Sequence, residues 1–380
     1  MNKLLIFFID AFAYDYLEKT NFLSDLNFDV SPLETLLGYS SSIMPSIWSG
    51  RYPEETGVWT EFYHHKRKPY TSLKMIGKIP DYYLRNGIKY FFLRLFQKTH
   101  NYDQTLLGIP ESIEHLFCRN NINYWIFPPV KLSCDSFDKF MKKKNISYDF
   151  DFHAYAVPQF LFPSSSQSRI SSNVFIRYIA TLDACGHLYG PKPRFFKDQL
   201  QDIEHLILTS YRMLSKTSDV DLVIFSDHGM TNVTKQYNLL EKLDNFTIKK
   251  DYLVFVDSTI ARFWFFNVNA KAQIIQILEQ CTYGHILNNA EIESYGLRFT
   301  DNRYGDLIFV ADPGVEFFPS FMRPIRFPFI GTDPKGLHGY TPEHPSTRGV
   351  FMYCGNKDLK LSNTMKITDI YQKLKLLIIS

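Results

Sequence analysis

Short apolar runs that end in aspartate or histidine recur along this chain. Residues 4–9 lead into Asp10, and residues 222–225 lead through a serine to Asp227 and His228. Short β-prone runs that alternate with helix-like stretches are typical of an α/β sheet whose strands are mostly parallel. Because ligands bind beyond the carboxyl ends of such strands, we expect these side chains to converge on one site.

The remaining elements fit the same class of fold. The expected strands are residues 4–9, 175–181, 222–225, 252–256, 261–266, 307–310 and 349–353. Apolar residues at helical spacing predict helices over 196–215 and 270–281. A chain of 380 residues is long enough for one large α/β domain with an inserted subdomain, or for two domains.

The sequence changes character between about residues 60 and 172. Lysines and arginines alternate there with tyrosines and phenylalanines from Lys66 to Lys98. We interpret residues 61–172 as a cap inserted into a catalytic core of residues 1–60 and 173–380. Three interpretations of its composition stay open: aromatic residues packed inside the cap, a surface for anionic lipid or a lipid-linked substrate, or a groove for single-stranded nucleic acid.

Bulk properties narrow the setting of the protein. A net charge of +3 is too small to indicate a nucleic-acid partner by itself. The N-terminal apolar run is too short for a secretory signal, and no apolar stretch reaches the length of a membrane span. Five cysteines without CxxC spacing predict reduced thiols. We therefore expect a cytoplasmic protein, with peripheral membrane contact through the insert as an option.

Two further segments combine aspartate, histidine and glycine. Asp183 is followed four residues later by His187, and His338 lies in a glycine-rich loop at 336–340. One strand-end aspartate alone is usually a cap or a loop residue. Several carboxylates and imidazoles gathered at one sheet edge, however, leave uncompensated charge unless they hold cations. Oxygen and nitrogen ligands without thiolate suit catalytic Zn²⁺, with Mn²⁺ or Fe as alternatives.

In this order, the motifs resemble the nucleotide pyrophosphatase/phosphodiesterase family of the alkaline phosphatase superfamily. The matching pieces are FID at 8–10, SGRYPEETG at 49–57, LDACGHLYGP at 182–191, SDHGM at 226–230 and GLHGY at 336–340. GDLIFVADPG at 305–314 is similar to a late core strand of the family. The resemblance implies an alkaline-phosphatase-like α/β/α sandwich with a mostly parallel central sheet and an inserted cap subdomain.

The resemblance also implies a site with two divalent metal ions. The ligands of one ion would be Asp183, His187 and His338. Those of the other would be Asp10, Asp227 and His228, with the oxygen of the nucleophilic serine reaching the same ion. That serine would form a covalent phosphoserine, which is then hydrolysed.

The nucleophile is assigned by spacing. In the family it lies ten residues before the glycine that ends the following helix, and counting back from Gly50 gives Ser40. A serine there is also a common helix N-cap. Pro45 departs from the family's proline two residues after the nucleophile, and proline is disfavoured past the first turn of a helix. Ser42 and, less favoured, Ser41 therefore compete with Ser40.

A second departure concerns the substrate. Family phosphodiesterases place an asparagine, which donates to a phosphate oxygen, twenty-one residues after the nucleophile; the same count here reaches Glu61. A carboxylate that faces a phosphate is repulsive unless it is protonated, paired or turned toward a cation. One hypothesis is that Glu61 contacts the amine of a phosphoethanolamine or aminophosphonate head group. The alternative is an offset loop that leaves Glu61 exposed.

The expected function is therefore hydrolysis of a phosphodiester or phosphomonoester through a phosphoserine. The substrate would be a small-molecule phosphate ester or a phosphorylated head group, and we do not expect nucleic acid. A catalytic rival is transfer of the phosphoryl-linked group to an acceptor other than water in lipid or glycan metabolism. A rival of another class is a non-catalytic module that binds phosphorylated ligands, against which the complete ligand set argues.

Overall fold

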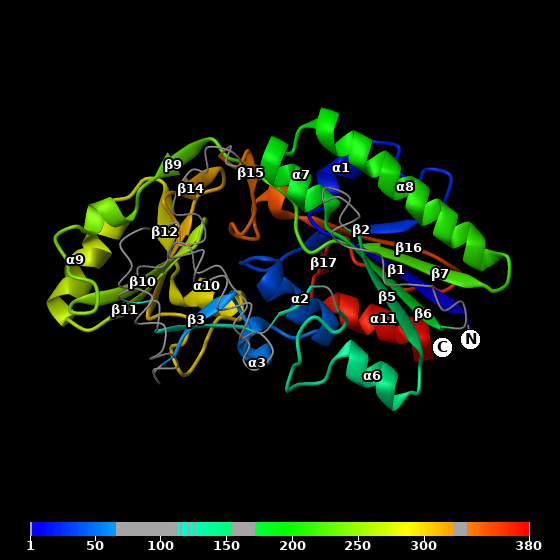
Figure 1. Cartoon of the computed structure of the whole chain (residues 1–380), viewed down its shortest axis with the longest axis horizontal. Coiled ribbons are helices and arrows are strands. Elements are labelled where there is room, and N and C mark those ends of the chain that lie inside the picture. Colours follow the sequence, from blue (N-terminus) through cyan, green and yellow to red (C-terminus); the bar gives the residue numbers. More distant parts are fainter. Residues whose placement is uncertain are drawn as a thin grey trace, which may run out of the picture.

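The protein has two lobes, each built on its own sheet (Figure 1). The computed structural model describes residues 2–65, 113, 116–120, 122–124, 126–153, 172–321 and 333–379. The basic and aromatic run from Lys66 to Lys98, with the lipid and nucleic-acid interpretations attached to it, lies outside the described residues. Within the described ranges, no helix combines the length and the apolar character needed to cross a membrane.

The larger lobe is built on a seven-stranded sheet with the order β17-β2-β16-β7-β1-β6-β5. The strands are β1 Lys3–Ile9, β2 Asp29–Glu34, β5 Tyr148–His153, β6 Val174–Ile179, β7 Val220–Phe225, β16 Gly349–Cys354 and β17 Met365–Lys366. Only β16 runs antiparallel to its neighbours, and every other pair is parallel. The expected mostly parallel central sheet is confirmed.

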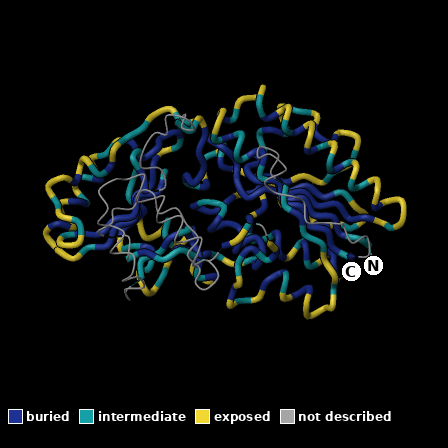
Figure 2. Tube along the Cα trace, in the orientation of Figure 1, coloured by how far each residue is buried: buried dark blue, intermediate teal, exposed yellow. Residues whose placement is uncertain are grey.

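Helices cover both faces of this sheet (Figures 1 and 2). In β1, Leu4, Ile6 and Phe8 pack in a core with one set of helices: α2 Ser40–Ser49, α6 Phe137–Lys143 and α11 Asp369–Ile379. The alternate residues of β1 pack with the other set: α1 Tyr14–Glu18, α7 Thr181–Tyr189 and α8 Pro193–Ser215. Burial of both faces explains why β1 is almost continuously apolar. The α/β/α sandwich is confirmed.

The smaller lobe contains a four-stranded antiparallel sheet with the order β10-β11-β13-β12. Its elements are β10 Tyr252–Val256, β11 Ile260–Phe265, α9 Val268–Glu279, β12 Gly284–Ile286, α10 Asn289–Ser294 and β13 Leu307–Ala311. The strands expected at 252–256, 261–266 and 307–310 exist, but not in the parallel sheet. Residues 257–259 alone connect β10 to β11, and so short a connection joins only antiparallel strands.

The limits of the predicted insert 61–172 need correction. Within it, β5 is the edge strand of the central sheet and α6 packs against the same core. The residues of β5 alternate between aromatic and polar, and Phe150 and Phe152 pack, partly buried, against the core. Near the start of the insert, β3 Phe62–His64 pairs with β4 Phe117–Arg119 in an antiparallel ladder.

Element boundaries differ from prediction at a few ends. The predicted helix 196–215 begins earlier, at Pro193, because proline suits the first helical position. Thr181 does not end a strand but begins α7. The other short elements are α3 Pro53–Thr56, β8 Thr231–Asn232, β9 Lys235–Tyr237, β14 Val315–Phe317, β15 Gly336–Leu337 and the 3₁₀ turns Leu240–Leu243 and Pro345–Thr347.

Candidate metal centre

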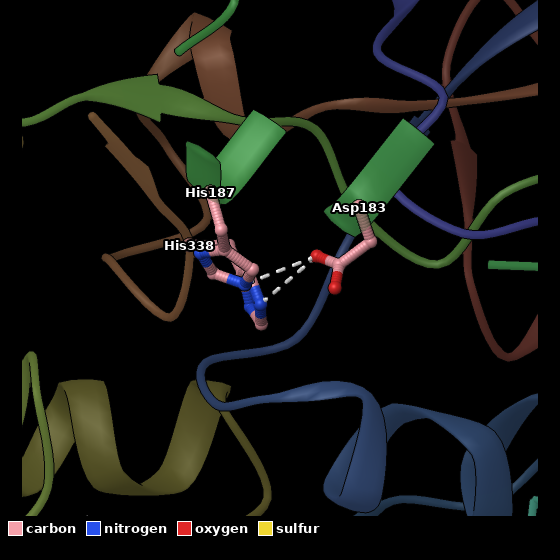
Figure 3. A group of neighbouring side chains, drawn as sticks. All are labelled: Asp183, His187 and His338. Atoms are coloured by element: carbon pink, nitrogen blue, oxygen red, sulfur yellow. Dashed lines mark ion pairs between the residues drawn. The ribbon is translucent and has the colours of Figure 1, made fainter. Parts of the chain in front are cut away.

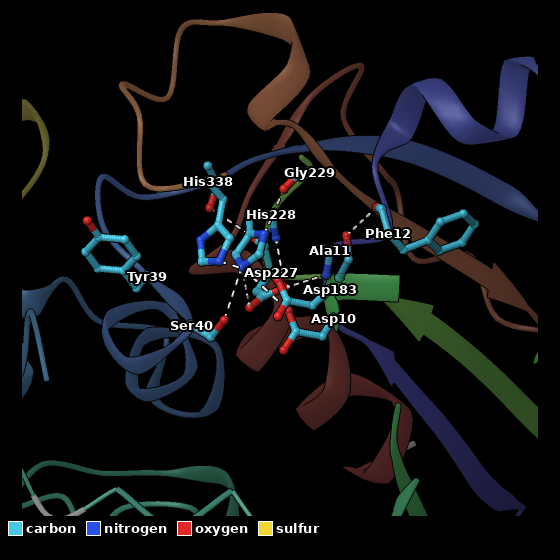
Figure 4. A network of polar contacts seen from close by, with 12 residues as sticks. Asp10, Ala11, Phe12, Tyr39, Ser40, Asp183, Asp227, His228, Gly229 and His338 are labelled. Carbon is cyan, nitrogen blue, oxygen red and sulfur yellow. Dashed lines mark hydrogen bonds and ion pairs between the residues drawn. The ribbon is translucent and has the colours of Figure 1, made fainter. Parts of the chain in front are cut away.

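Acidic residues and histidines meet at the carboxyl edge of the central sheet. Asp10 follows β1, Asp227 and His228 follow β7, and Asp183 lies in the first turn of α7, after β6. These three strands are adjacent and parallel, so their carboxyl ends share one edge. Figure 4 shows their side chains pointing toward one another, with His338 above them.

One cluster is formed by Asp183, His187 and His338 (Figure 3). Asp183 Oδ1 lies 3.3 Å from His187 Nε2 and 3.4 Å from His338 Nε2. The helical spacing of four residues places Asp183 and His187 on the same face of α7. His187 Nδ1 donates to the Gly336 carbonyl at 2.9 Å, so Nε2 is the ring nitrogen that faces the cluster.

A second cluster lies beside the first. His228 Nε2 is 3.5 Å from Asp10 Oδ1 and 3.3 Å from Asp227 Oδ2. The Nδ1 of His228 donates to the Gly229 carbonyl at 2.8 Å, so Nε2 again faces the carboxylates. Asp183 is also close enough to group with Asp10 and His228, their ligand atoms lying within 4.8 Å of one another. The two clusters are therefore contiguous.

Several of these buried atoms have no hydrogen-bond partner among the described residues. They are Asp10 Oδ1, Asp183 Oδ1, Asp227 Oδ2 and His338 Nδ1. Buried polar atoms are normally hydrogen-bonded, and a buried carboxylate without compensation is costly. Burial raises the pKa of Asp10 well above its usual range, and the nearby Asp227 and Asp183 carboxylates raise it further. Orphaned carboxylate oxygens that lie beside the Nε2 atoms of three histidines fit divalent cations.

The neutral state of His338 fits the same role. Although burial opposes the shift, Asp183 raises the pKa of His187 to about 9, so a cation bound there would displace the His187 proton. Burial lowers the pKa of His338 to about 3, and the neighbouring His228 acts in the same direction. The ring centroids of His338 and His228 lie 3.8 Å apart in a stacked arrangement. A neutral imidazole is the form that binds a metal.

Ser40 lies beside His228 of the second cluster, whereas Ser42 bonds to the backbone at the start of α2. Ser40 is the first residue of α2, and its Oγ is 3.1 Å from His228 Nε2. The Ser42 side chain is fully buried, and its Oγ donates to the Tyr39 carbonyl and accepts from the Tyr39 amide at 2.6 and 2.9 Å. Pro45 lies inside α2, so it does not prevent a helix that begins at Ser40.

A cavity of about 450 Å³ opens beside the two clusters. Besides Ser40 and four of the metal-site residues (Asp10, Asp183, His187 and His338), its walls contain Tyr39, Ser41, Glu61, Tyr124, Phe152, Tyr178, Ala180, Asp257, Ser258 and Leu337. Glu61 forms an ion pair with Arg119 on β4, so it lies in the cavity wall rather than on the open surface. Asp257 lies 3.3 Å from the guanidinium of the buried Arg262.

Three features of the site were not predicted. Tyr178 on β6 donates to Asp10 Oδ2, fixing one oxygen of that carboxylate. Arg119 is opposite Phe62 in the β3–β4 ladder, a pairing without a local sequence signal. Asp257 and Ser258 enter the cavity from the smaller lobe. The short connection at 257–259 could have indicated a hairpin, but not that its turn reaches this site.

Two comparisons of the sequence identify similar proteins. Residues 4–341 match the family described as type I phosphodiesterase / nucleotide pyrophosphatase. A rat (Rattus norvegicus) protein, ectonucleotide pyrophosphatase/phosphodiesterase family member 7, is 33% identical over 78 residues, which span 19% of this chain and only 18% of that protein.

Two solved structures share the fold. Human ectonucleotide pyrophosphatase/phosphodiesterase 5 is similar with a TM-score of 0.64 and 15% identity, over 99% of this chain and 94% of that one. The murine counterpart, an inactive threonine-to-alanine variant in complex with AMP, has a TM-score of 0.63 and 15% identity, over 100% and 95% of the two chains.

Proposed function

We propose that this chain, which belongs to the type I phosphodiesterase / nucleotide pyrophosphatase family, hydrolyses phosphate esters with Ser40 as its nucleophile. The observation that carries the proposal is the position of the Ser40 hydroxyl, 3.1 Å from His228 Nε2 at the edge of the ligand clusters. The adjoining cavity has room for the rest of a small substrate. The murine relative was solved with AMP, a phosphate ester, which supports this class of ligand.

Two divalent cations, zinc before Mn²⁺ or Fe, would fit the orphaned ligand atoms. Asp183, His187 and His338 would hold one, and Asp10, Asp227 and His228 the other. Bound there, the cations would supply positive charge that polarises the phosphoryl group and stabilises developing negative charge. Tyr178 and the Gly336 and Gly229 carbonyls would orient the ligands from behind.

In the proposed reaction, Ser40 Oγ attacks phosphorus and loses its proton to solvent. A P–Oγ bond forms, the ester P–O bond breaks, and the departing alcohol takes up a proton. Water then attacks the phosphoserine, the P–Oγ bond breaks, and Ser40 regains a proton while the phosphate product leaves. The amino end of α2, where Ser40 lies, favours the negative charge of the phosphoryl group.

Glu61 is proposed to contact the part of the substrate beyond the phosphate. The ion pair with Arg119 reduces the repulsion between the Glu61 carboxylate and a substrate phosphate, because a paired carboxylate presents less net charge. A cationic amine on the substrate would add a favourable contact to the carboxylate. A substrate with such a group remains our preferred hypothesis for this wall.

The proposal is tested by hydrolysis of bis-p-nitrophenyl phosphate and p-nitrophenyl phosphate before and after chelation. We expect turnover that is lost with the metal and restored by zinc. The ratio of the two rates ranks diester against monoester. Two bound metals without turnover of any ester would contradict hydrolysis and favour transfer or ligand binding.

A further inference from the structure

The turn between β10 and β11 brings a residue of the smaller lobe to the nucleophile helix. Thr259, in this turn, is fully buried. Its amide donates to the Tyr39 hydroxyl at 3.0 Å, and its own Oγ1 lies 2.8 Å from the same hydroxyl. Thr259 Oγ1 also reaches the carbonyls of His338 and Gly339, at 3.3 and 3.0 Å.

The hydrogens of this network have one consistent arrangement. The Tyr39 hydroxyl accepts from the Thr259 amide and donates to Thr259 Oγ1. The Thr259 hydroxyl then donates to the two carbonyls, since carbonyls only accept. Every donor of the pair is used, so loss of either hydroxyl leaves a buried group unsatisfied.

Close packing also holds Tyr39 and Thr259 against the His338–Gly339 segment. The Tyr39 ring meets the His338 imidazole edge-on, with ring centroids 5.7 Å apart. Figure 4 draws both side chains. A Cβ atom on Gly339, whose φ is +87°, would lie 2.7 Å from Thr259 Oγ1 and 2.8 Å from Tyr39 Cε1. The His338–Gly339 backbone can approach the pair only because residue 339 is glycine.

The backbone of Tyr39 is also held in place, by Ser42. Its backbone amide and carbonyl both bond to Ser42 Oγ in the first turn of α2. Side chain and backbone of Tyr39 are therefore held from two sides, and Ser40 comes directly after it. A shift of the Tyr39 ring would be passed to Ser40 through one peptide unit.

We propose that Tyr39 and Thr259 are positioning residues, a bridge that sets Ser40 against the metal ligand His338 from the smaller lobe. This inference rests on the proposed function, in which Ser40 attacks the phosphate. Neither side chain needs to touch the reacting atoms. The smaller lobe then contributes to catalysis. Its turn contacts Tyr39, which precedes Ser40, and it also contacts the loop that carries His338.

The test compares Tyr39→Phe, Thr259→Val and Thr259→Ser with the zinc-loaded full chain. Misplacement of the serine is expected to lower kcat by about 10- to 100-fold in the first two variants. At saturating zinc KM should change less than kcat, because the cations that would bind the phosphate are then in place. Thr259→Ser keeps the hydroxyl and is expected to recover most of kcat.

Two controls separate positioning from general stability. Tyr371→Phe removes a hydroxyl bond to Asp135 at the opposite end of α2, where the Tyr371 ring packs on Gly50. It should lower the melting temperature without lowering kcat. The second control does not depend on activity. The Thr259 hydroxyl holds the His338 loop, so the chelator concentration that removes half of the zinc should be lower in Thr259→Val. In Thr259→Ser this concentration should return toward that of the unaltered protein.

The outcomes are distinct. Wild-type kcat in both Tyr39→Phe and Thr259→Val would overturn the bridge while leaving the proposed function intact. If the unaltered protein hydrolyses no phosphate ester, the proposed function fails instead. The chelator comparison then decides alone, and equal zinc retention in the unaltered protein and Thr259→Val overturns the bridge.

Discussion

The two lobes contribute to the site in different ways. The larger lobe supplies Asp10, Asp183, Asp227 and His228 from the shared carboxyl edge of three parallel strands. The smaller lobe supplies one turn, residues 257–259, from an antiparallel hairpin. A parallel sheet collects side chains from distant segments at one edge, whereas a hairpin offers only its tip. The larger lobe is thus suited to hold the charged ligand side chains. The smaller lobe is suited to shape the cavity and to position residues around it.

The largest effect is expected for Ser40, the proposed nucleophile, in the larger lobe. Ser40→Ala should lower kcat by about 10⁴-fold or more and prevent formation of a labelled phosphoenzyme, because no hydroxyl remains to attack. Ser42→Ala should retain the phosphoenzyme and lose about 1 kcal/mol of stability with the helix cap. Acid-quench trapping followed by peptide mapping distinguishes them, and label on Ser42 would refute the assignment.

Next in size is loss of a metal ligand. Asp227→Ala should lower activity by about a thousandfold, the equivalent of several kcal/mol of lost charge stabilisation, and reduce the bound metal. Asp221→Ala is the matched control: it is a buried aspartate at the amino end of the same strand, bonded to Tyr353. Elemental analysis should find full metal in Asp221→Ala, and full metal with normal turnover in Asp227→Ala would remove the ligand assignment.

A smaller change is expected at the cavity wall between the lobes. Glu61→Asn removes a carboxylate and leaves the Arg119 charge available to a phosphate. The kcat/KM of simple aryl diesters should rise about fivefold, the equivalent of about 1 kcal/mol. Arg119→Gln should act in the opposite direction on the same substrates. Steady-state kinetics that show no change in either variant would mean that this pair does not face the phosphate.

The stability of the smaller lobe is expected to depend on pH through the buried carboxyl group of Asp257. Burial raises the pKa of Asp257 to about 6, although Arg262 opposes the shift. Because the folded pKa exceeds the unfolded value of about 3.9, the native protein should lose stability as pH rises from about 4 to 6. Asp257→Asn removes this titration.

The measurement is the free energy of unfolding of both proteins at several pH values. The free energy of unfolding of Asp257→Asn, minus that of the unaltered protein, should rise by at most about 3 kcal/mol between pH 4 and pH 7. A constant offset, such as that from an unpaired Arg262, does not affect this slope. A difference that is flat or falls would contradict the raised pKa.

The sequence predicted most of the larger lobe because its signals are local. The apolar run of β1, the pair Asp183 and His187 at helical spacing, and the strand-end Asp227 each carry their own pattern. Parallel strand ends then meet by geometry alone. Six candidate metal ligands could therefore be named before their distances were known, and their role stays a prediction.

The smaller lobe shows why the rest was missed. Glu61 pairs with Arg119 across a ladder whose register no short motif encodes. Tyr39 and Thr259 are 220 residues apart, and either could be an ordinary core residue. Such contacts depend on how separate elements pack, which periodicity does not report. The hairpin at 252–265 was recognisable from its short connection, and weighing that length would have corrected the sheet assignment.

The central claim is that the carboxyl edge of the central sheet holds two divalent cations beside Ser40. The most direct test is X-ray diffraction from zinc-loaded crystals, recorded on both sides of the zinc absorption edge. Two anomalous peaks are predicted, one within about 2.2 Å of ligand atoms of Asp183, His187 and His338, the other equally close to Asp10, Asp227 and His228. Peaks elsewhere, or none after loading, would contradict the account.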